Sequence, residues 1–160
     1  MRKFVFALIA CVALSGAAAA RTVAVPPNDP AIVVTLPSSW KTEKIDYGYS
    51  AMSPNNDVFL SVEYAKAANV EGMMKLNDDW MKENSIKPVK PTKEEGTLNG
   101  IPVTHFAFDT TDENGPTLVD FFLMEANKHA ALITIWGSIA ERKTHKTDVD
   151  AFISSLKPTH

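Results

Sequence analysis

Short runs in which apolar and polar residues alternate recur along this chain, and they predict β-strands. The expected strands cover residues 31–36, 47–52, 57–64, 93–98, 101–109, 118–125 and 130–137. The turn signal Ser53-Pro54-Asn55-Asn56 follows the second run. Asn99-Gly100, the dipeptide most typical of a two-residue hairpin, follows the fourth, and Asn127 links the last two strands.

Two other stretches have the spacing of an amphipathic helix. The first, residues 69–84, begins at Asn69, a residue type that caps helix N-termini, and Asn77 interrupts its apolar stripe. That stripe consists of Val70, Met73, Met74, Trp80 and Met81. The second stretch is residues 148–157, and we expect Thr147 to cap it and Pro158 to end it. Its apolar face consists of Val149, Phe152, Ile153 and Leu156.

The late strands are apolar on both of their faces. One predicted face carries Phe106, Phe108, Val119, Phe121, Leu123, Ala131, Ile133 and Ile135. The opposite face carries Ala107, Leu118, Phe122, Met124, Leu132 and Trp136. Strands that are apolar on both sides are covered on both sides. The sequence therefore predicts an α+β fold, a mainly antiparallel sheet of about six to seven strands sandwiched between helices (α/β/α), with Trp40 and Phe152 buried.

The first 20 residues have the order of a secretory signal peptide. A positively charged start precedes an apolar run, residues 4–14, and Ala18-Ala19-Ala20 then precedes Arg21. This order predicts cleavage between Ala20 and Arg21 and export to the periplasm or beyond it. The alternative is a lipoprotein, because Leu8-Ile9-Ala10-Cys11 resembles a lipobox. Against it, the sequence after Cys11 stays apolar, where a lipoprotein begins a polar tether.

Removal of this leader from the 160 residues leaves 140, enough for one domain with a buried core. We expect residues 21–30, with three prolines, to form an irregular lead-in and residues 31–160 to form the domain, without a transmembrane segment. The net charge of −3 becomes −5 without the two cations of the leader, which argues against nucleic acid as a partner. The only cysteine, Cys11, leaves with the leader, so the mature chain has no disulfide or thiol chemistry.

The order of the elements and two short motifs are informative together. Pro37-Ser38-Ser39-Trp40 follows the first strand, and Phe152-Ile153-Ser154-Ser155-Leu156 lies near the end of the chain. With the mid-chain helix and the hairpins, they give residues 31–158 a pattern that resembles the PsbP-like α/β/α sandwich and its bacterial exported relatives of the DcrB type. The resemblance implies an accessory or binding role, in photosystem assembly or at the cell envelope, and it implies no shared active site.

No motif for catalysis or metal binding stands out in the sequence. A Gly-x-Ser-x-Gly elbow, a glycine-rich phosphate loop, closely spaced histidine pairs and EF-hand spacing are all absent. The hairpin register that pairs Asp109 with Leu118 brings several polar side chains to one sheet face, where they form a candidate site for a small polar ligand. These residues are His105, Asp109, Asp120, Thr134 and Trp136. The alternative is that this face is partly solvated, or that these groups hydrogen-bond to covering loops.

These observations favour a non-enzymatic, exported binding or accessory protein of the bacterial cell envelope, whose partner is an envelope protein or a small polar ligand. We expect no cofactor and no metal centre, since no sequence-local pair fixes ligand geometry around His105, Asp109 and Asp120. Two alternatives stay open. One is a small hydrolase or other enzyme with a polar site near His105. The other is a structural subunit that docks by a sheet edge or by its Met-rich helix.

Overall fold

The strands form two antiparallel sheets in the computed structural model, which describes residues 20–126 and 128–159. The large sheet has the order β3-β4-β5-β9-β8-β7-β6, and the small sheet has the order β1-β2-β10. The large sheet comprises β3 (Lys41–Ile45), β4 (Gly48–Met52), β5 (Phe59–Lys66), β6 (Thr92–Leu98), β7 (Ile101–Asp112), β8 (Gly115–Ala126) and β9 (His129–Gly137). The small sheet comprises β1 (Arg21–Val25), β2 (Ile32–Leu36) and β10 (Lys157–Pro158). Residues 1–19 of the predicted leader, with Cys11, and the link at Asn127 lie outside the described residues.

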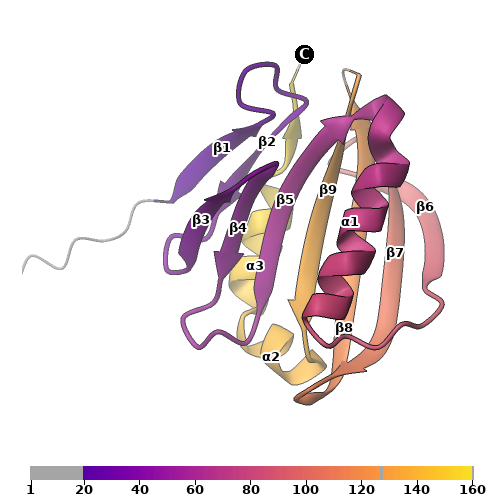
Figure 1. Cartoon of the computed structure of the whole chain (residues 1–160). Coiled ribbons are helices and arrows are strands. Elements are labelled where there is room, and N and C mark those ends of the chain that lie inside the picture. The colour runs from indigo at the N-terminus through magenta and orange to yellow at the C-terminus, as the bar shows by residue number, and fades with distance from the viewer. Residues whose placement is uncertain (1–19, 127, 160) are drawn as a thin grey trace, which may run out of the picture.

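The large sheet lies between two covering layers, which confirms the predicted fold class. One face is covered by α1 (Val70–Glu83), which continues the 3₁₀ turn η1 (Ala67–Asn69). The small sheet and α3 (Lys146–Ser154) cover the other face, and α2 (Ile139–Thr144) lies at one end of the large sheet (Figure 1). No helix within the described ranges is long and apolar enough to cross a membrane.

The segment 21–30, expected to be irregular, contains a strand. β1 pairs with β2 along its whole length, from Arg21 opposite Leu36 to Val25 opposite Ile32. Val23 and Val25 are buried, while Arg21 and Thr22 are exposed, so this short strand has one apolar face. The prolines lie after β1, so they end the strand without interrupting it. The layer on this face of the large sheet therefore includes a second, smaller sheet.

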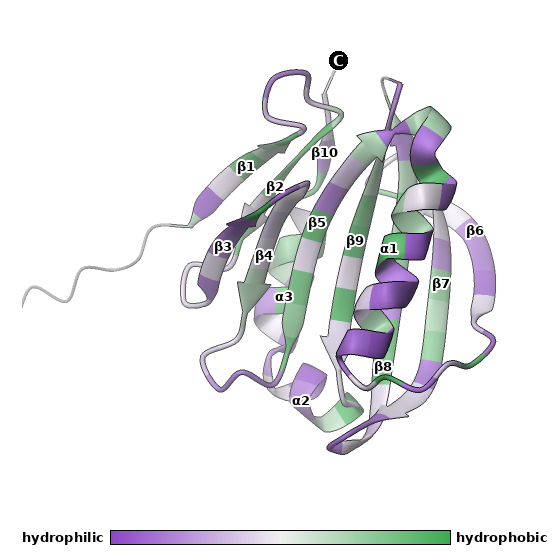
Figure 2. Ribbon diagram, viewed as in Figure 1, coloured by the Kyte–Doolittle hydropathy of each residue, from purple (hydrophilic) through white to green (hydrophobic). Residues whose placement is uncertain are grey.

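The face of α1 that lies on the large sheet is apolar, as its spacing predicts. Met73 and Met81 are buried in a cluster with Phe121 of the sheet, and Figure 2 shows hydrophilic and hydrophobic bands along this helix. Asn77 is buried within the stripe because its Nδ2 donates to the carbonyl oxygen of Met73 at 3.0 Å. Asn69 occupies the N-cap position, as predicted, but its side chain makes no hydrogen bond to the start of the helix, which continues η1.

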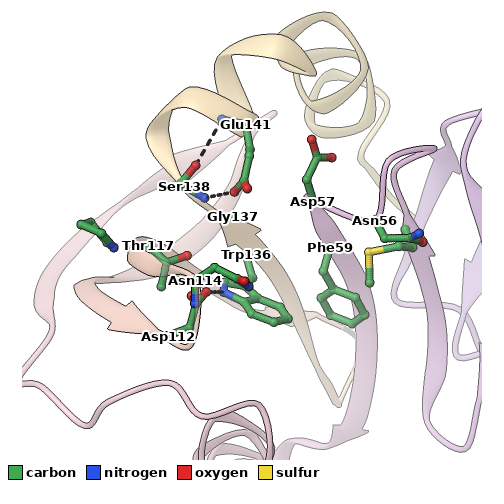
Figure 3. A pocket seen from close by; sticks show the side chains of 12 residues that line it. Asn56, Asp57, Phe59, Asp112, Asn114, Thr117, Trp136, Gly137, Ser138 and Glu141 are labelled. Atoms are coloured by element: carbon green, nitrogen blue, oxygen red, sulfur yellow. Dashed lines mark hydrogen bonds between the residues drawn. The ribbon is translucent and has the colours of Figure 1, made fainter.

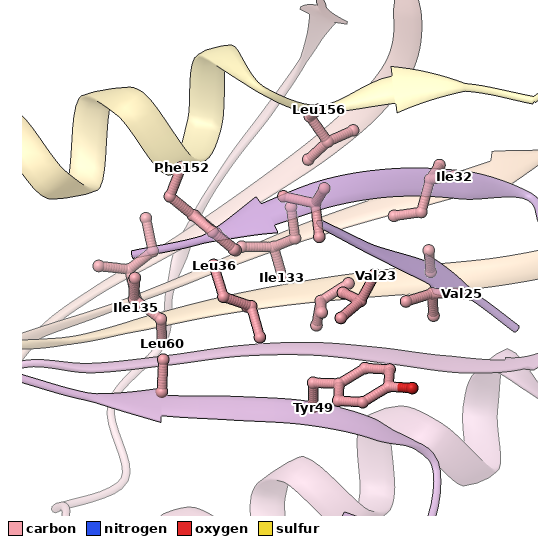
Figure 4. Close-up of a cluster of buried hydrophobic side chains, with 14 of the residues drawn as sticks. Val23, Val25, Ile32, Leu36, Tyr49, Leu60, Ile133, Ile135, Phe152 and Leu156 are labelled. Carbon is pink, nitrogen blue, oxygen red and sulfur yellow. The ribbon is translucent and has the colours of Figure 1, made fainter. Parts of the chain in front are cut away.

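The second core lies between the large sheet and the layer of the small sheet with α3. Figure 4 shows Phe152 and Leu156 of the C-terminal segment among the side chains of this core. Phe152 is only 1% exposed and Trp40 only 4%, which confirms both predicted anchors. The Trp40 Nε1 donates to Asp148 Oδ2 at 2.9 Å, so the indole also ties the turn before β3 to α3.

The register of the late strands is partly as predicted. In the β7–β8 hairpin, Asp109 pairs with Leu118, Ala107 with Asp120 and His105 with Phe122, as expected. The prediction for β9 is wrong by one residue, because Asp120 pairs with Ile135 and Val119 with Trp136. Three residues of β9 therefore lie on the opposite face from Phe121, in the core below the small sheet: Ala131, Ile133 and Ile135.

The C-terminal helix differs from the prediction of one helix over 148–157. The chain forms α2 and α3, and His145 ends the first and begins the second. Thr147 lies inside α3 and is not its cap, and α3 ends at Ser154, before Pro158 pairs with Ile32 in β10. A capping box formed by Ser138 and Glu141 starts α2 at Ile139, whereas the apolar spacing predicts no helix before residue 148.

The Asn99-Gly100 turn joins β6 and β7 as predicted. Its two central residues have φ angles of 52° and 83°, the left-handed values that a two-residue hairpin turn requires. The Asn99 Nδ2 also donates to the carbonyl oxygens of Ile153 and Leu156, at 2.8 and 3.0 Å. This turn therefore fastens the end of α3 to the edge of the large sheet.

Candidate binding pocket

The five residues of the predicted ligand site do not lie on one face of the sheet. His105 and Asp120 do meet, with His105 Nε2 at 2.6 Å from Asp120 Oδ1. Asp109 lies on the same face of β7 and is exposed. Trp136, like Thr134, lies on the other face of the sheet, because β9 is shifted by one residue from the predicted register.

The His105 and Asp120 side chains belong to a packed network. The second carboxylate oxygen of Asp120 accepts a hydrogen bond from Arg142 of α2, and the side chains of Asp120 and Arg142 are only 16% and 17% exposed. The His105 ring stacks on Phe122, with 4.4 Å between ring centroids. Both oxygens of Asp120 are thus engaged by neighbouring side chains, which favours the structural interpretation of this pair.

Arg142 fastens α2 to the ends of two strands. Its Nη2 donates to the carbonyl oxygens of Leu118 and Ile135, each at 2.6 Å, and its Nε donates to that of Gly137 at 3.0 Å. The carbonyls at the ends of β8 and β9 therefore share one cation with Asp120. This arrangement holds the part of the chain that forms one wall of a nearby pocket.

Trp136 lines this pocket, at the end of the large sheet where β5 and β8 begin and β4, β7 and β9 end. We call it the sheet-end pocket, and its volume is about 310 Å³. Figure 3 shows its lining side chains, which come from three separate stretches of the chain. They are Met52, Asn56, Asp57, Phe59, Asp112, Asn114, Pro116, Thr117, Trp136, Gly137, Ser138 and Glu141.

The loop between β4 and β5 forms a rigid side of the sheet-end pocket. Ser53 is buried, and its Oγ accepts hydrogen bonds from the N–H groups of Asp57 and Val58 at 3.1 and 3.0 Å while it donates to the Asp57 carboxylate. His145 Nε2 lies 2.9 Å from Asp57 Oδ1. Burial raises the pKa of Asp57, but the Ser53 hydroxyl and the His145 charge outweigh it and leave the pKa below its usual range.

The turn between β7 and β8 holds a second carboxylate in place. Asp112 Oδ2 accepts a hydrogen bond from Trp136 Nε1 at 3.1 Å, and Asp112 Oδ1 accepts one from the Asn114 N–H at 2.8 Å. Trp80 of α1 packs edge-on against Trp136, with 5.6 Å between the ring centroids. These contacts fix the orientation of the indole at the pocket wall.

The third carboxylate of the pocket comes from the start of α2. Glu141 Oε2 accepts a hydrogen bond from the Ser138 N–H at 2.7 Å, and Ser138 Oγ accepts one from the Glu141 N–H at 3.3 Å. This capping box fixes the Glu141 side chain beside Gly137. A side chain at Gly137 would begin 3.0 Å from the Asp57 carbonyl oxygen, so glycine permits β9 to end close to the β4–β5 loop.

A buried hydroxyl in the pocket wall has no partner. Thr117 is 3% exposed, and its Oγ1 makes no hydrogen bond. Figure 3 shows this hydroxyl turned toward the space between Trp136 and Glu141. A buried hydroxyl without a partner costs about 1–3 kcal/mol, so one that persists in a pocket wall is a candidate ligand contact.

A larger groove runs between α1 and the β5 side of the sheet, with a volume of about 1040 Å³. Glu63 lines it, and burial raises the pKa of this carboxyl against the opposing effect of the Ser61 hydroxyl, which donates to it at 2.8 Å. Tyr47 and Leu76 are exposed at this groove. Across the described residues, no three His, Cys, Asp or Glu side chains converge as they would around a metal ion.

Sequence reasoning missed most of the sheet-end pocket. Of its residues it named only Trp136 as a ligand contact, and it did not name Asp112, Thr117 or Glu141. One local signal is present in the sequence: Ser138 and Glu141 have the spacing of a capping box, which predicts the start of a helix directly after a strand. Nothing local in the sequence indicates that the β4–β5 loop lies beside them.

Comparison with known proteins supports the fold and leaves the function open. Neither a family model nor a curated protein matches the sequence. The structure is similar to that of cyanobacterial PsbP (CyanoP) from Synechocystis sp. PCC 6803, with a TM-score of 0.62 and 10% identity over 91% of this chain and 95% of that chain. A protein from Bacteroides thetaiotaomicron VPI-5482 matches with a TM-score of 0.54 and 10% identity over 81% of this chain and 45% of its own.

A third similar structure is LpqN, a protein involved in cell envelope biogenesis of Mycobacterium tuberculosis. Its TM-score is 0.50, with 11% identity over 89% of this chain and 91% of LpqN. At such low identity the similarity shows the fold alone. The chain therefore has a PsbP-like fold, as the order of its elements predicts.

Proposed function

We propose that this protein is an exported, non-enzymatic binding protein of the bacterial cell envelope that holds a small polar ligand in the sheet-end pocket. Three features support the proposal: the leader pattern of residues 1–20, a fold shared with LpqN, and a pocket of ligand size. The observation that carries it is Thr117, whose hydroxyl is buried in the pocket wall without a partner.

An enzymatic site near His105 has less support. The His105 ring is stacked on Phe122 and bonded to Asp120, and Asp120 is in turn bonded to Arg142. A histidine acts as a general base when it lies within reach of a substrate proton or of a nucleophile. None of the residues that line the sheet-end pocket is a histidine, and His105 is not among them. The network around His105 accounts for its own burial without a substrate.

Docking through a sheet edge or through the Met-rich helix also has less support. Met73 and Met81 are buried against the sheet, so they are not available to a partner. The edge strands β3 and β6 are exposed and carry charged residues, among them Lys41, Glu43 and Lys93. Charges on an edge strand oppose the addition of another strand.

The test is to identify what the protein carries when it is isolated from the envelope. Small molecules released on denaturation are compared between the wild type and Asn114→Trp, which places a large ring at the exposed rim of the pocket. Glu113→Trp is the matched control, because Glu113 is exposed in the same turn and does not line the pocket. We expect one compound from the wild type and the control and its loss from Asn114→Trp. Equal recovery from all three proteins, or none from any, would contradict the proposal.

A further inference from the structure

We propose that the ligand of the sheet-end pocket is a small organic cation, an ammonium group that carries alkyl substituents. This inference rests on the proposed function and specifies the chemistry of its ligand. It follows from the charge of the pocket, from its aromatic wall and from the unpartnered hydroxyl.

The charge of the pocket is negative and is not compensated within its wall. Asp112 is held by the Trp136 indole and a backbone N–H, and Glu141 by the Ser138 N–H. These donors are neutral, so they orient the two carboxylates and leave their charges in place. Among the described residues that line the pocket, none is Lys, Arg or His.

The nearby cations are engaged elsewhere. His145 faces Asp57, with its Nε2 2.9 Å from Asp57 Oδ1. Arg142 donates to Asp120 and to three strand-end carbonyls, including that of Ile135. The attraction for a cation is therefore concentrated at Asp112 and Glu141.

The wall beside these carboxylates is aromatic and apolar. Trp136, Phe59 and Met52 line it, and Figure 3 shows the two rings at the base of the pocket. The hydrogen bond of the indole N–H to Asp112 holds Trp136 by its edge, and an indole face attracts a cation more strongly than the other aromatic rings do. A convergence of three His, Cys, Asp or Glu side chains would instead indicate a metal ion, and the described residues show none.

The Thr117 hydroxyl is an observation independent of the charges. It is buried, unpartnered and turned into the same space, so it can bond a hydroxyl or an N–H of a bound molecule. The volume of about 310 Å³ is at the lower end of the range for ligand pockets, which suits a small molecule. Alkylammonium ions that also carry a hydroxyl group satisfy all three features.

The experiment is calorimetric titration of the purified protein with choline as the probe. Its neutral isostere 3,3-dimethylbutan-1-ol has the same shape without the charge, and acetate and Ca²⁺ complete the series. The variants are Asp112→Asn and Glu141→Gln, which remove charge but keep an acceptor for Trp136 and a capping box at α2. Glu113→Gln is the matched control, since it changes the net charge equally and does not line the pocket. Thr117→Val removes only the hydroxyl.

We expect choline to bind and the isostere to bind at least about tenfold more weakly, because a desolvated cation–π and carboxylate site discriminates by charge. Asp112→Asn and Glu141→Gln should each weaken choline binding by about fivefold or more, and Glu113→Gln should leave it unchanged. Thr117→Val should weaken binding without lowering the melting temperature.

Other outcomes would overturn the inference. Equal binding of choline and its isostere, preferential binding of acetate, or displacement of choline by low Ca²⁺ would each show that the site is not built for an organic cation. A neutral or anionic compound recovered from the wild type but not from Asn114→Trp would also overturn it while leaving the proposed function intact. No recovered compound and no choline binding would remove both.

Discussion

Replacement of Arg142 by methionine should destabilise this protein strongly, because the Arg142 side chain is largely buried. The substitution removes the cation that faces Asp120 and the donors to Leu118, Ile135 and Gly137. The pair is about five-sixths buried, so Asp120 would retain a largely buried charge with only His105 as its partner. Breaking a buried pair in this way costs about 3–5 kcal/mol.

The measurement is urea unfolding of the wild type and Arg142→Met, with thermal melting as a second readout. A loss of about 3–5 kcal/mol corresponds to a fall in melting temperature of roughly 10 °C for a domain of this size. Lys146→Met is the control, since Lys146 pairs with Asp150 on the exposed face of α3, with side chains 69% and 58% exposed. Such a pair contributes about 0.3–0.5 kcal/mol.

A double variant separates the pair from the carbonyl bonds. Asp120→Asn combined with Arg142→Met removes both charges of the pair. The sum of the stability losses of the two single variants should therefore exceed the stability loss of the double variant by about 0.5–3 kcal/mol. A loss below 1 kcal/mol in Arg142→Met would refute the interpretation of this network as structural. It would also reopen His105 and Asp120 as a functional pair.

Three further predictions follow from the core, from a buried carboxyl and from the leader. Phe152→Ala should lose about 3–5 kcal/mol in chemical denaturation, whereas Leu76→Ala on the exposed side of α1 should lose less than about 1 kcal/mol. Burial raises the pKa of Glu63, so the wild type should lose stability relative to Glu63→Gln as pH rises above about 4. Thermal melts of the two proteins should thus agree near pH 4 and favour the variant at pH 8, and an equal difference at both pH values would contradict the assignment. The intact mass of the exported protein should correspond to a chain that begins at Arg21, and a chain that begins with an acylated Cys11 would contradict cleavage after Ala20.

The sequence predicts the elements of the fold better than their pairing. The β7–β8 register is predictable because Asp109 and Asp120 are polar and must share a face if the other face is to stay apolar. The same argument fails for β9, which has apolar residues at nearly every position. A shift of β9 by one residue places Leu132 where Ile133 would be, and both faces of the strand stay apolar.

The candidate pocket could not be predicted for a different reason. Its walls come from the β4–β5 loop, the β7–β8 turn, the end of β9 and the start of α2. Their proximity can be recognised only once the order of the strands in the sheet is known. Polar turn residues such as Asn56 and Asn114 have an ordinary local explanation. The missing partner of Thr117 is a property of packing and has no signal in the sequence.

The indole resonances in an amide-correlation NMR spectrum test the central claim most directly, because Trp136 and Trp40 report on different places. Trp136 Nε1–H is bonded to Asp112 in the sheet-end pocket, whereas Trp40 Nε1–H is bonded to Asp148 of α3 and Trp40 does not line the pocket. On titration with choline, we expect the Trp136 indole resonance to shift saturably and further than that of Trp40, and Asp112→Asn should raise the choline concentration at half-saturation by about fivefold or more. A spectrum in which the Trp136 resonance does not move, or moves no further than that of Trp40, would contradict an organic-cation site in this pocket.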